Sequence, residues 1–255
     1  MFSRGVLATL LLSSSIALAQ RPASTLQSPA TLPIVFTKTV SADGSHAGDV
    51  VLARTSQSVR LADGRILASG AKIVGHVTAA NRFTYDKTPY AHQKPSVLSI
   101  HFDSIEVSGK AVPLNVTVRA MADPLTSWGA REPGPSDLDP TQTVTQIGGD
   151  QMSRWQSEVV NRDGDVVAYN KRGGVYAHLI SNGRCDGSDV EVSVGIYSAS
   201  ACGLYGFTNV AASECGSAAT PSTLTLVSTR TSPKVWKHST ALLEVLPSQQ
   251  VVASR

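Results

Sequence analysis

Short apolar runs with a two-residue period recur along most of this chain, and this pattern most constrains its fold. In the range 112–118, alternate positions are apolar: Val112, Leu114, Val116 and Val118. Successive side chains of a β-strand point to opposite faces, so a period of two places these residues on one face, whereas a helix would scatter them. We therefore expect a strand here with one buried face.

Similar runs are separated by turn residues such as Asp63-Gly64, which predicts a hairpin. The spacing of about ten residues between turns is typical of a β-sandwich or barrel. Strands are expected over the ranges 49–54, 58–61, 72–77, 97–102, 105–107, 112–118, 165–169, 175–180, 190–197, 222–227 and 241–246. We predict a mainly β fold, with a barrel-like or sandwich N-terminal module at 33–122 and a second, disulfide-stapled β region at 150–255.

The first twenty residues indicate where the protein is sent in the cell rather than how it folds. Arg4 precedes an apolar run at 6–12, and Ala17-Leu18-Ala19 offers small residues for cleavage before Gln20. The apolar run is too short and too rich in serine to anchor the chain in a bilayer. Residues 1–19 are therefore predicted to be a secretory signal peptide. Its cleavage would leave no integral membrane span and deliver the protein to the periplasm, the outer envelope or the medium.

Two segments lack a hydrophobic period. Residues 20–32 are rich in Pro, Ser, Thr and Gln, which predicts a flexible lead-in. Residues 123–149 are interrupted by prolines and glycines, which predicts a linker or long loop. After this segment, Met152, Trp155 and Val159 are spaced as on one face of a helix, so we expect a short helix at 150–160.

All three cysteines, Cys185, Cys202 and Cys215, lie in one region of the chain. An exported protein tends to oxidise one pair and to keep the third thiol. Cys202–Cys215 would close the shortest loop and Cys185–Cys202 a loop only slightly longer, so both pairings stay open. A metal site would need Cys-x-x-Cys or histidines at ligand spacing, and neither is present. A structural disulfide is therefore the interpretation that we favour.

Catalytic and ligand-binding motifs are scarce in this sequence. It contains no nucleophile elbow, metalloprotease motif or phosphate-binding loop, and none of its six histidines is paired at ligand spacing. We assign no catalytic, cofactor-binding or metal-ligating residue and expect no cofactor. The net charge is only +3, with Lys and Arg dispersed, so nucleic acid is not an expected partner. The isolated Trp128, Trp155 and Trp236 suggest anchors rather than a stacking platform.

Residues 48–122 resemble the periplasmic β-barrel of TrbI-like channel subunits from conjugal-transfer and type IV secretion systems. The likeness rests on the segments 48–53, 70–75 and 98–105, with sequences GDVVLA, GAKIVG and LSIHFDSI. This resemblance implies a barrel module that assembles by lateral contact in the cell envelope. Those subunits carry an uncleaved membrane helix, whereas this chain is predicted to begin with a cleavable signal. The segment 201–207 is similar to exported bacterial proteins with no assigned role.

Three functions follow as hypotheses. The first is an exported, non-enzymatic bacterial envelope protein that works by interaction or assembly. Its partners would be other envelope proteins or further copies of itself, bound through strand edges and the loops at 81–95 and 123–149. The first alternative is a small-ligand or glycan-binding module that uses Tyr85, Tyr90 and His92 of the first loop. The second alternative is a hydrolase with a dispersed site.

Overall fold

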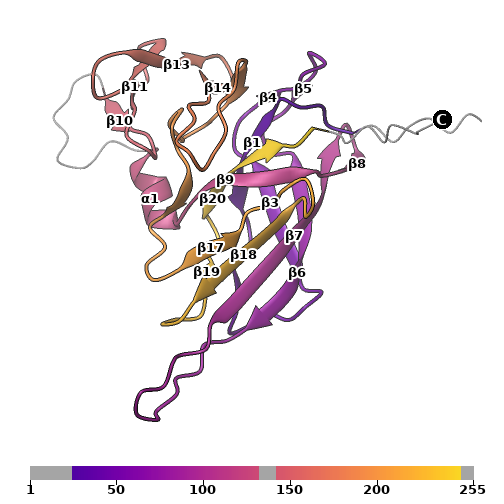
Figure 1. Cartoon of the computed structure of the whole chain (residues 1–255). Coiled ribbons are helices and arrows are strands. Elements are labelled where there is room, and N and C mark those ends of the chain that lie inside the picture. The colour runs from indigo at the N-terminus through magenta and orange to yellow at the C-terminus, as the bar shows by residue number, and fades with distance from the viewer. Residues whose placement is uncertain (1–24, 132–141, 248–255) are drawn as a thin grey trace, which may run out of the picture.

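The structure, a computed structural model, describes residues 25–131 and 142–247 and is mainly β. The predicted signal peptide lies outside the described residues. A ten-stranded sheet dominates the molecule (Figure 1). In sheet order its strands are β16 (Gly203–Tyr205), β9 (Val116–Ala122), β20 (Thr240–Val245), β1 (Thr31–Phe36), β3 (Val50–Thr55), β6 (Lys72–Asn81), β7 (Ser96–Val107), β18 (Thr223–Ser228) and β17 (Ala211–Glu214), with β8 (Lys110–Pro113) paired to β7.

This sheet curls into a nearly closed barrel. Its two end strands, β16 and β17, contact each other. The chain between β17 and β18 also bonds directly to β9: the Val118 amide donates to the Cys215 carbonyl at 2.6 Å, and the Ser222 amide donates to the Val116 carbonyl at 2.7 Å. All neighbouring strands are antiparallel except β16 and β9, which run parallel. The prediction of a mainly β fold with a barrel-like sheet is confirmed, but this sheet also includes strands from beyond residue 122.

The barrel interior is filled by large apolar side chains. The alternating residues of the strands supply one continuous cluster, in which Phe36 and Phe102 have ring centroids 6.3 Å apart. In β18 the period of two is plain, because Leu224 and Leu226 are fully buried while the threonines beside them are half-buried. Since aliphatic and aromatic side chains occupy this space, a ligand would have to bind outside the barrel wall.

A second, six-stranded antiparallel sheet is inserted between β9 and β16, and Figure 1 shows it at the upper left. Its strands follow one another as a meander: β10 (Thr143–Thr145), β11 (Gln151–Ser153), β12 (Glu158–Val160), β13 (Val166–Lys171), β14 (Gly174–His178) and β15 (Glu191–Ser193). Two short pairs complete the fold: β2 (Val40–Ser41) with β19 (Lys234–Val235), and β4 (Val59–Arg60) with β5 (Ile66–Leu67). The hairpin predicted at Asp63-Gly64 joins β4 to β5.

The prediction of a helix at 150–160 is wrong. This segment forms β11 and β12, in which Met152 and Val159 are directly paired across the two strands. A tight turn between these strands brings together the two apolar residues that the helix was expected to align. Trp155 lies in the turn itself. Periodicity over so few residues cannot separate a helix from a hairpin.

A helix forms instead in the segment predicted as linker or loop. Helix α1 (Pro124–Gly129) begins after Asp123, whose Oδ1 accepts a hydrogen bond from the Thr126 amide at 2.8 Å. An aspartate cap followed by proline at the first helical position is a standard helix start. The same predicted segment also contains β10, so it is more regular than the sequence indicated.

The segment predicted as a flexible lead-in is ordered where it is described from Leu26 onward. Leu26 and Ala30 are buried in the barrel cluster, and β1 begins at Thr31, between β20 and β3. The expected C-terminal β region is also divided in space. Strands β10 to β15 form the inserted sheet, whereas β16, β17, β18 and β20 complete the barrel that the N-terminal strands begin.

Candidate functional site

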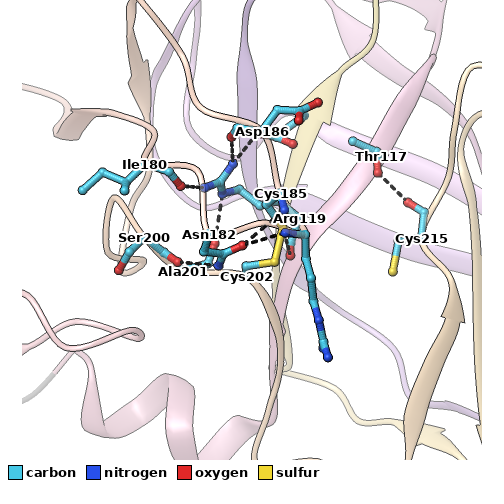
Figure 2. Close-up of a disulfide and its surroundings, with 12 residues drawn as sticks. Thr117, Arg119, Ile180, Asn182, Cys185, Asp186, Ser200, Ala201, Cys202 and Cys215 are labelled. Atoms are coloured by element: carbon cyan, nitrogen blue, oxygen red, sulfur yellow. Dashed lines mark hydrogen bonds and ion pairs between the residues drawn. A yellow bond between two sulfur atoms is a disulfide. The ribbon is translucent and has the colours of Figure 1, made fainter.

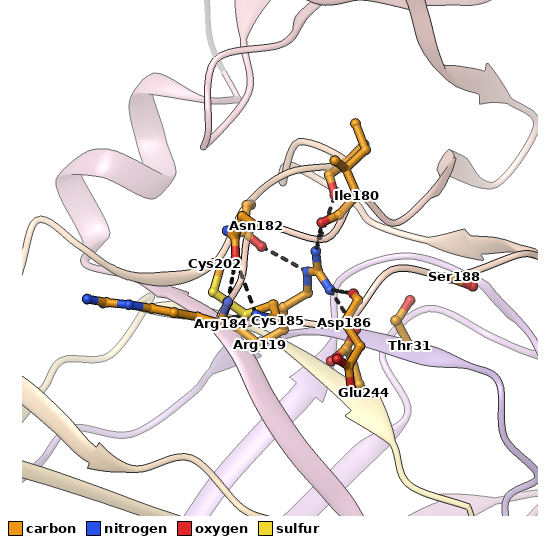
Figure 3. A network of polar contacts seen from close by, with 12 residues as sticks. Thr31, Arg119, Ile180, Asn182, Arg184, Cys185, Asp186, Ser188, Cys202 and Glu244 are labelled. Atoms are coloured by element: carbon orange, nitrogen blue, oxygen red, sulfur yellow. Dashed lines mark hydrogen bonds and ion pairs between the residues drawn. A yellow bond between two sulfur atoms is a disulfide. The ribbon is translucent and has the colours of Figure 1, made fainter.

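The inserted sheet is fastened to the barrel by Arg119 of β9, whose side chain is fully buried. Its guanidinium donates to the carbonyl oxygens of Ala201 at 2.9 Å and Ile180 at 2.6 Å, and also to that of Asp186. Its Nη1 lies 3.0 Å from a carboxylate oxygen of Glu244 on β20 (Figure 3). Because this side chain is surrounded by acceptors, we interpret Arg119 as a structural clamp and not as a binding group.

A disulfide reinforces the same attachment. Cys185 and Cys202 are bonded, and Cys215 keeps a free thiol (Figure 2). Of the two pairings left open by the sequence, the structure thus selects the longer loop. The Cys215 carbonyl is held on β9 by the Thr117 hydroxyl at 2.9 Å. Burial, with a smaller contribution from Glu214, raises the pKa of the Cys215 thiol, so this cysteine is a poor nucleophile.

A second attachment uses Gln57, a buried amide between β3 and β4. Its Nε2 donates to the Val175 carbonyl and its Oε1 accepts from the Val175 amide, both at 3.1 Å. The side chain thus pairs with strand β14 as another strand would. Gly174 permits this approach, since a Cβ there would lie 2.2 Å from the Gln57 amide oxygen. On the other side of the insertion, the Tyr197 hydroxyl lies 2.8 Å from that of Thr240 on β20.

Between these attachments lies a cleft of about 760 Å³, with the barrel wall on one side and the inserted sheet on the other. Three arginines line it: Arg54 from β3, Arg131 from the end of α1 and Arg154 from the turn after β11. No Asp or Glu within 25–131 or 142–247 is among its lining residues. Three separate parts of the chain thus bring positively charged side chains to the lining of one cleft.

Two contacts define the surroundings of these arginines. Arg54 is paired directly with Lys72 on the neighbouring strand β6, so two positive charges share one face of the barrel. Like charges in that position repel each other and destabilise a sheet. Arg154 donates from Nη2 to the Arg131 carbonyl at 3.0 Å, which brings the two other arginine-bearing segments together.

Neutral polar groups fill out the lining of the cleft. Ser56, Ser69 and Asn170 contribute hydroxyl and amide groups. Gln146 is buried at the base, where its Nε2 donates to the Gly195 carbonyl at 3.0 Å, while its Oε1 has no partner among the described residues. Such a lining offers charge-assisted donors for an anion and neutral groups for hydroxyls.

The predicted ligand residues Tyr85, Tyr90 and His92 lie elsewhere. They belong to the loop between β6 and β7, which projects from the lower end of the barrel in Figure 1, far from the inserted sheet. Tyr85 is 64% exposed and Tyr90 is 100% exposed. The loop is organised by Asp86, which accepts from the Thr88 amide at 2.9 Å. None of the three residues lines the cleft.

A histidine–aspartate cluster on the outer barrel wall resembles part of a catalytic site. The His76 Nδ1 lies 2.9 Å from the Asp103 carboxylate, and His101 is the cross-strand partner of His76. No serine or cysteine of the described residues is hydrogen-bonded to either histidine, so this cluster lacks the nucleophile of a triad. Within the same residues no three His, Cys, Asp or Glu side chains are placed to hold a metal ion.

Sequence patterns did not predict the arginine-lined cleft. Arg54, Arg131 and Arg154 are far apart in the chain and occur in no motif. The one local signal is that Arg54 lies in a strand, at a position whose side chain points outward, opposite the apolar residues of the same strand. Arg131 and Arg154 reach the cleft only because of how the inserted sheet packs against the barrel.

Comparisons with known proteins assign no family to this chain. No protein-family model matches the chain, and neither a curated protein nor a solved structure is significantly similar to it. The likeness to TrbI-like channel subunits therefore stays a prediction. None of the helices in the described part of the chain has the length and apolar character to cross a membrane.

Proposed function

We propose that this chain is an exported, non-enzymatic binding protein that takes up an anionic ligand in the arginine-lined cleft. The observation that carries this proposal is the convergence of Arg54, Arg131 and Arg154 on one cleft that no described carboxylate lines. Guanidinium groups bind carboxylates and phosphates through paired, charge-assisted hydrogen bonds. A bound anion would also relieve the repulsion between Arg54 and Lys72.

Export is supported by the signal-like residues 1–19 and, more weakly, by the disulfide between Cys185 and Cys202. A binding role rather than a catalytic one is supported by the character of the cleft. Its lining contains cations, amides and hydroxyls, but no histidine, cysteine or described carboxylate that could serve as general base or nucleophile.

The test is titration calorimetry of the chain without residues 1–19 against citrate and inorganic phosphate, at low and at moderate ionic strength. We expect binding that weakens with salt, because the attraction is between charges. Arg54→Gln and Arg131→Gln should each weaken it about tenfold, as expected for loss of one charge-assisted hydrogen bond. Arg82→Gln, which removes an exposed arginine from the loop between β6 and β7, is the matched control and should leave the affinity unchanged.

Absence of binding to every anion would overturn the proposal. So would equal losses in Arg82→Gln and in the cleft variants, because the attraction would then belong to the net charge of the protein and not to a site.

A second candidate function is attachment to an envelope partner, or to another copy of this chain, through the loop between β6 and β7. The observation that favours it is the exposure of Tyr85 and Tyr90 on a segment that projects from a rigid barrel. Tyrosines are enriched at the centres of protein interfaces.

This second candidate is tested by crosslinking the tagged protein in cells, followed by sizing of the envelope fraction. A discrete large species that disappears in Tyr85→Ala/Tyr90→Ala would support attachment through the loop. The same species in that double variant, or a monomer in both proteins, would contradict it.

A further inference from the structure

Two tryptophans with largely exposed side chains lie in the same chain segments as Arg131 and Arg154 of the cleft lining. Trp128 is 67% exposed and Trp155 is 78% exposed. The Arg131 amide donates to the Trp128 carbonyl at 2.8 Å, and Trp155 directly follows Arg154. Because Arg154 is hydrogen-bonded to the Arg131 carbonyl, the two tryptophan-bearing segments meet at this rim. The sequence suggests that both tryptophans are anchors, but their side chains are too exposed for that role.

Exposure of two tryptophans in neighbouring segments is costly, because their large apolar rings stay in contact with water. Trp128 occupies α1, whose buried side is provided by Ser127, so the helix packs through a small residue and leaves its largest one outside. Leu125, one turn earlier, is exposed as well. An apolar surface of this kind next to a polar cleft marks an interaction site.

We infer that the ligand of this cleft is an acidic saccharide, a chain of sugar rings that carry carboxylates. This inference rests on the proposed function and names its ligand class. The carboxylates would bind Arg54 and Arg131, and the apolar faces of the sugar rings would stack on Trp128 and Trp155. Ring hydroxyls would bond to Asn170 and to the serines of the cleft lining, which can each donate and accept.

A single-stranded nucleic acid also combines negative charge with flat rings, but the charge distribution favours the saccharide. Nucleic-acid grooves carry a continuous basic track along the backbone of the ligand. Here the net charge is only +3, and three arginines line one cleft while the other Lys and Arg are dispersed along the chain. A short ligand with a few negative charges fits this pattern better than a polyanion.

The experiment compares four probes by calorimetry with the chain lacking residues 1–19: tetragalacturonate, its fully methyl-esterified and neutral form, citrate, and an eight-residue thymidine oligonucleotide. We expect tetragalacturonate to bind at least tenfold more tightly than the other three. Trp128→Ala and Trp155→Ala should each weaken tetragalacturonate about five- to tenfold, the usual cost of losing one aromatic stacking contact, and leave citrate unchanged. Tyr90→Ala removes a fully exposed aromatic ring far from the cleft and is the control.

The outcomes separate this inference from the proposed function. If citrate binds as tightly as tetragalacturonate, and the tryptophan variants bind both normally, the anion site stands and the saccharide inference is overturned. Tightest binding of the oligonucleotide would likewise overturn it. If none of the charged probes binds, the proposed function itself fails. Tryptophan fluorescence, quenched by tetragalacturonate in the parent chain and less so in each variant, gives a second readout that does not depend on calorimetric heat.

Discussion

The barrel and the inserted sheet are made of similar strands, yet they are held together in different ways. The barrel encloses phenylalanines, isoleucines and leucines in one continuous cluster. The cluster of the inserted sheet is small and consists mainly of short side chains: Val159, Ala168, Val175, Ala177, Leu179, Val192, Val194 and Ala199. Since hydrophobic stabilisation scales with buried apolar area, the insertion gains much less from its own core.

The insertion depends instead on specific attachments to the barrel. Arg119 and the Cys185–Cys202 disulfide hold one side, and Gln57 holds the other. These polar and covalent contacts join particular atoms of the two regions, so they fix where the insertion lies on the barrel. The cleft lies between the two regions, so its shape depends on these attachments. The two regions should therefore respond differently to substitution.

The largest effect is expected from Phe102→Ala in the barrel. Phe102 is 1% exposed and packs near Phe36, so its removal should lower the free energy of unfolding by about 3–5 kcal/mol. Denaturant unfolding measures this loss. Val159→Ala, a truncation in the smaller cluster, should cost less and should loosen only the inserted sheet. Equal costs for the two variants would argue against the proposed difference between the regions.

The next largest effect should follow removal of the disulfide in Cys185→Ser/Cys202→Ser. The bond joins residues 17 positions apart, and a loop of that size contributes about 3 kcal/mol. Hydrogen exchange should quicken in residues 179–202 while the barrel strands stay protected. Cys215→Ser, which removes only the free thiol, is the control. If exchange quickened equally throughout the barrel, the disulfide would be a support for the whole chain and not for the insertion.

A smaller loss is expected for Gln57→Ala, which removes the acceptor of the Val175 amide and one of the two donors to the Val175 carbonyl, the other being the Val194 amide at 2.9 Å. Loss of both hydrogen bonds, with the buried amide left unpaired, should cost about 2 kcal/mol in total. The exchange rate of the Val175 amide and the affinity for citrate should change together, because the same contact fixes the cleft. Gln151→Ala, in an exposed part of β11, should alter neither. If exchange of the Val175 amide changed while the affinity for citrate did not, the Gln57 contact would not determine the shape of the cleft.

The smallest effect concerns Glu244, whose carboxylate pairs with Arg119. Burial raises its pKa above the ordinary 4.5, although the nearby guanidinium opposes this shift. When the folded-state pKa is the higher one, the folded protein holds its proton longer, so stability falls as pH rises from about 4.5 through the folded-state pKa. Glu244→Gln should therefore flatten the decline of Tm over this range.

The control for Glu244 is Glu191→Gln, which alters an ion pair with Lys171 on the surface of the inserted sheet. Its Tm profile should keep the slope of the parent chain. A parent profile that rises with pH in this window, together with a flat profile for Glu244→Gln, would show that the ion pair outweighs burial.

Much of the strand content was predictable from local pattern. The alternation at 112–118 and at 222–227 corresponds to β8, β9 and β18, and the turn at Asp63-Gly64 is where it was expected. The segment 150–160 was not predictable in the same way. Its apolar spacing fits one face of a helix, but Met152 and Val159 face each other across a hairpin, and only the pairing of β11 with β12 distinguishes the two.

The candidate site could not be predicted from local sequence patterns, for a related reason. Exposed tyrosines in the loop at 81–95 were visible in the sequence, but a cleft is made by residues that are distant in the chain. Arg54 belongs to the barrel, whereas Arg131 and Arg154 belong to the insertion. No periodicity or spacing in the sequence indicates that the barrel and the insertion bring these arginines together.

By itself, the sequence determined that the chain would form strands and turns, and that two of three neighbouring cysteines would pair, because these properties depend on alternation, turn residues and proximity along the chain. Only the tertiary structure decided that the C-terminal strands close the barrel begun by the N-terminal ones, that Cys185 and not Cys215 bonds to Cys202, and that three arginines share a cleft. The physical reason is that strand pairing and docking are contacts between distant segments, whose energy depends on which surfaces meet and not on the order of residues within either segment.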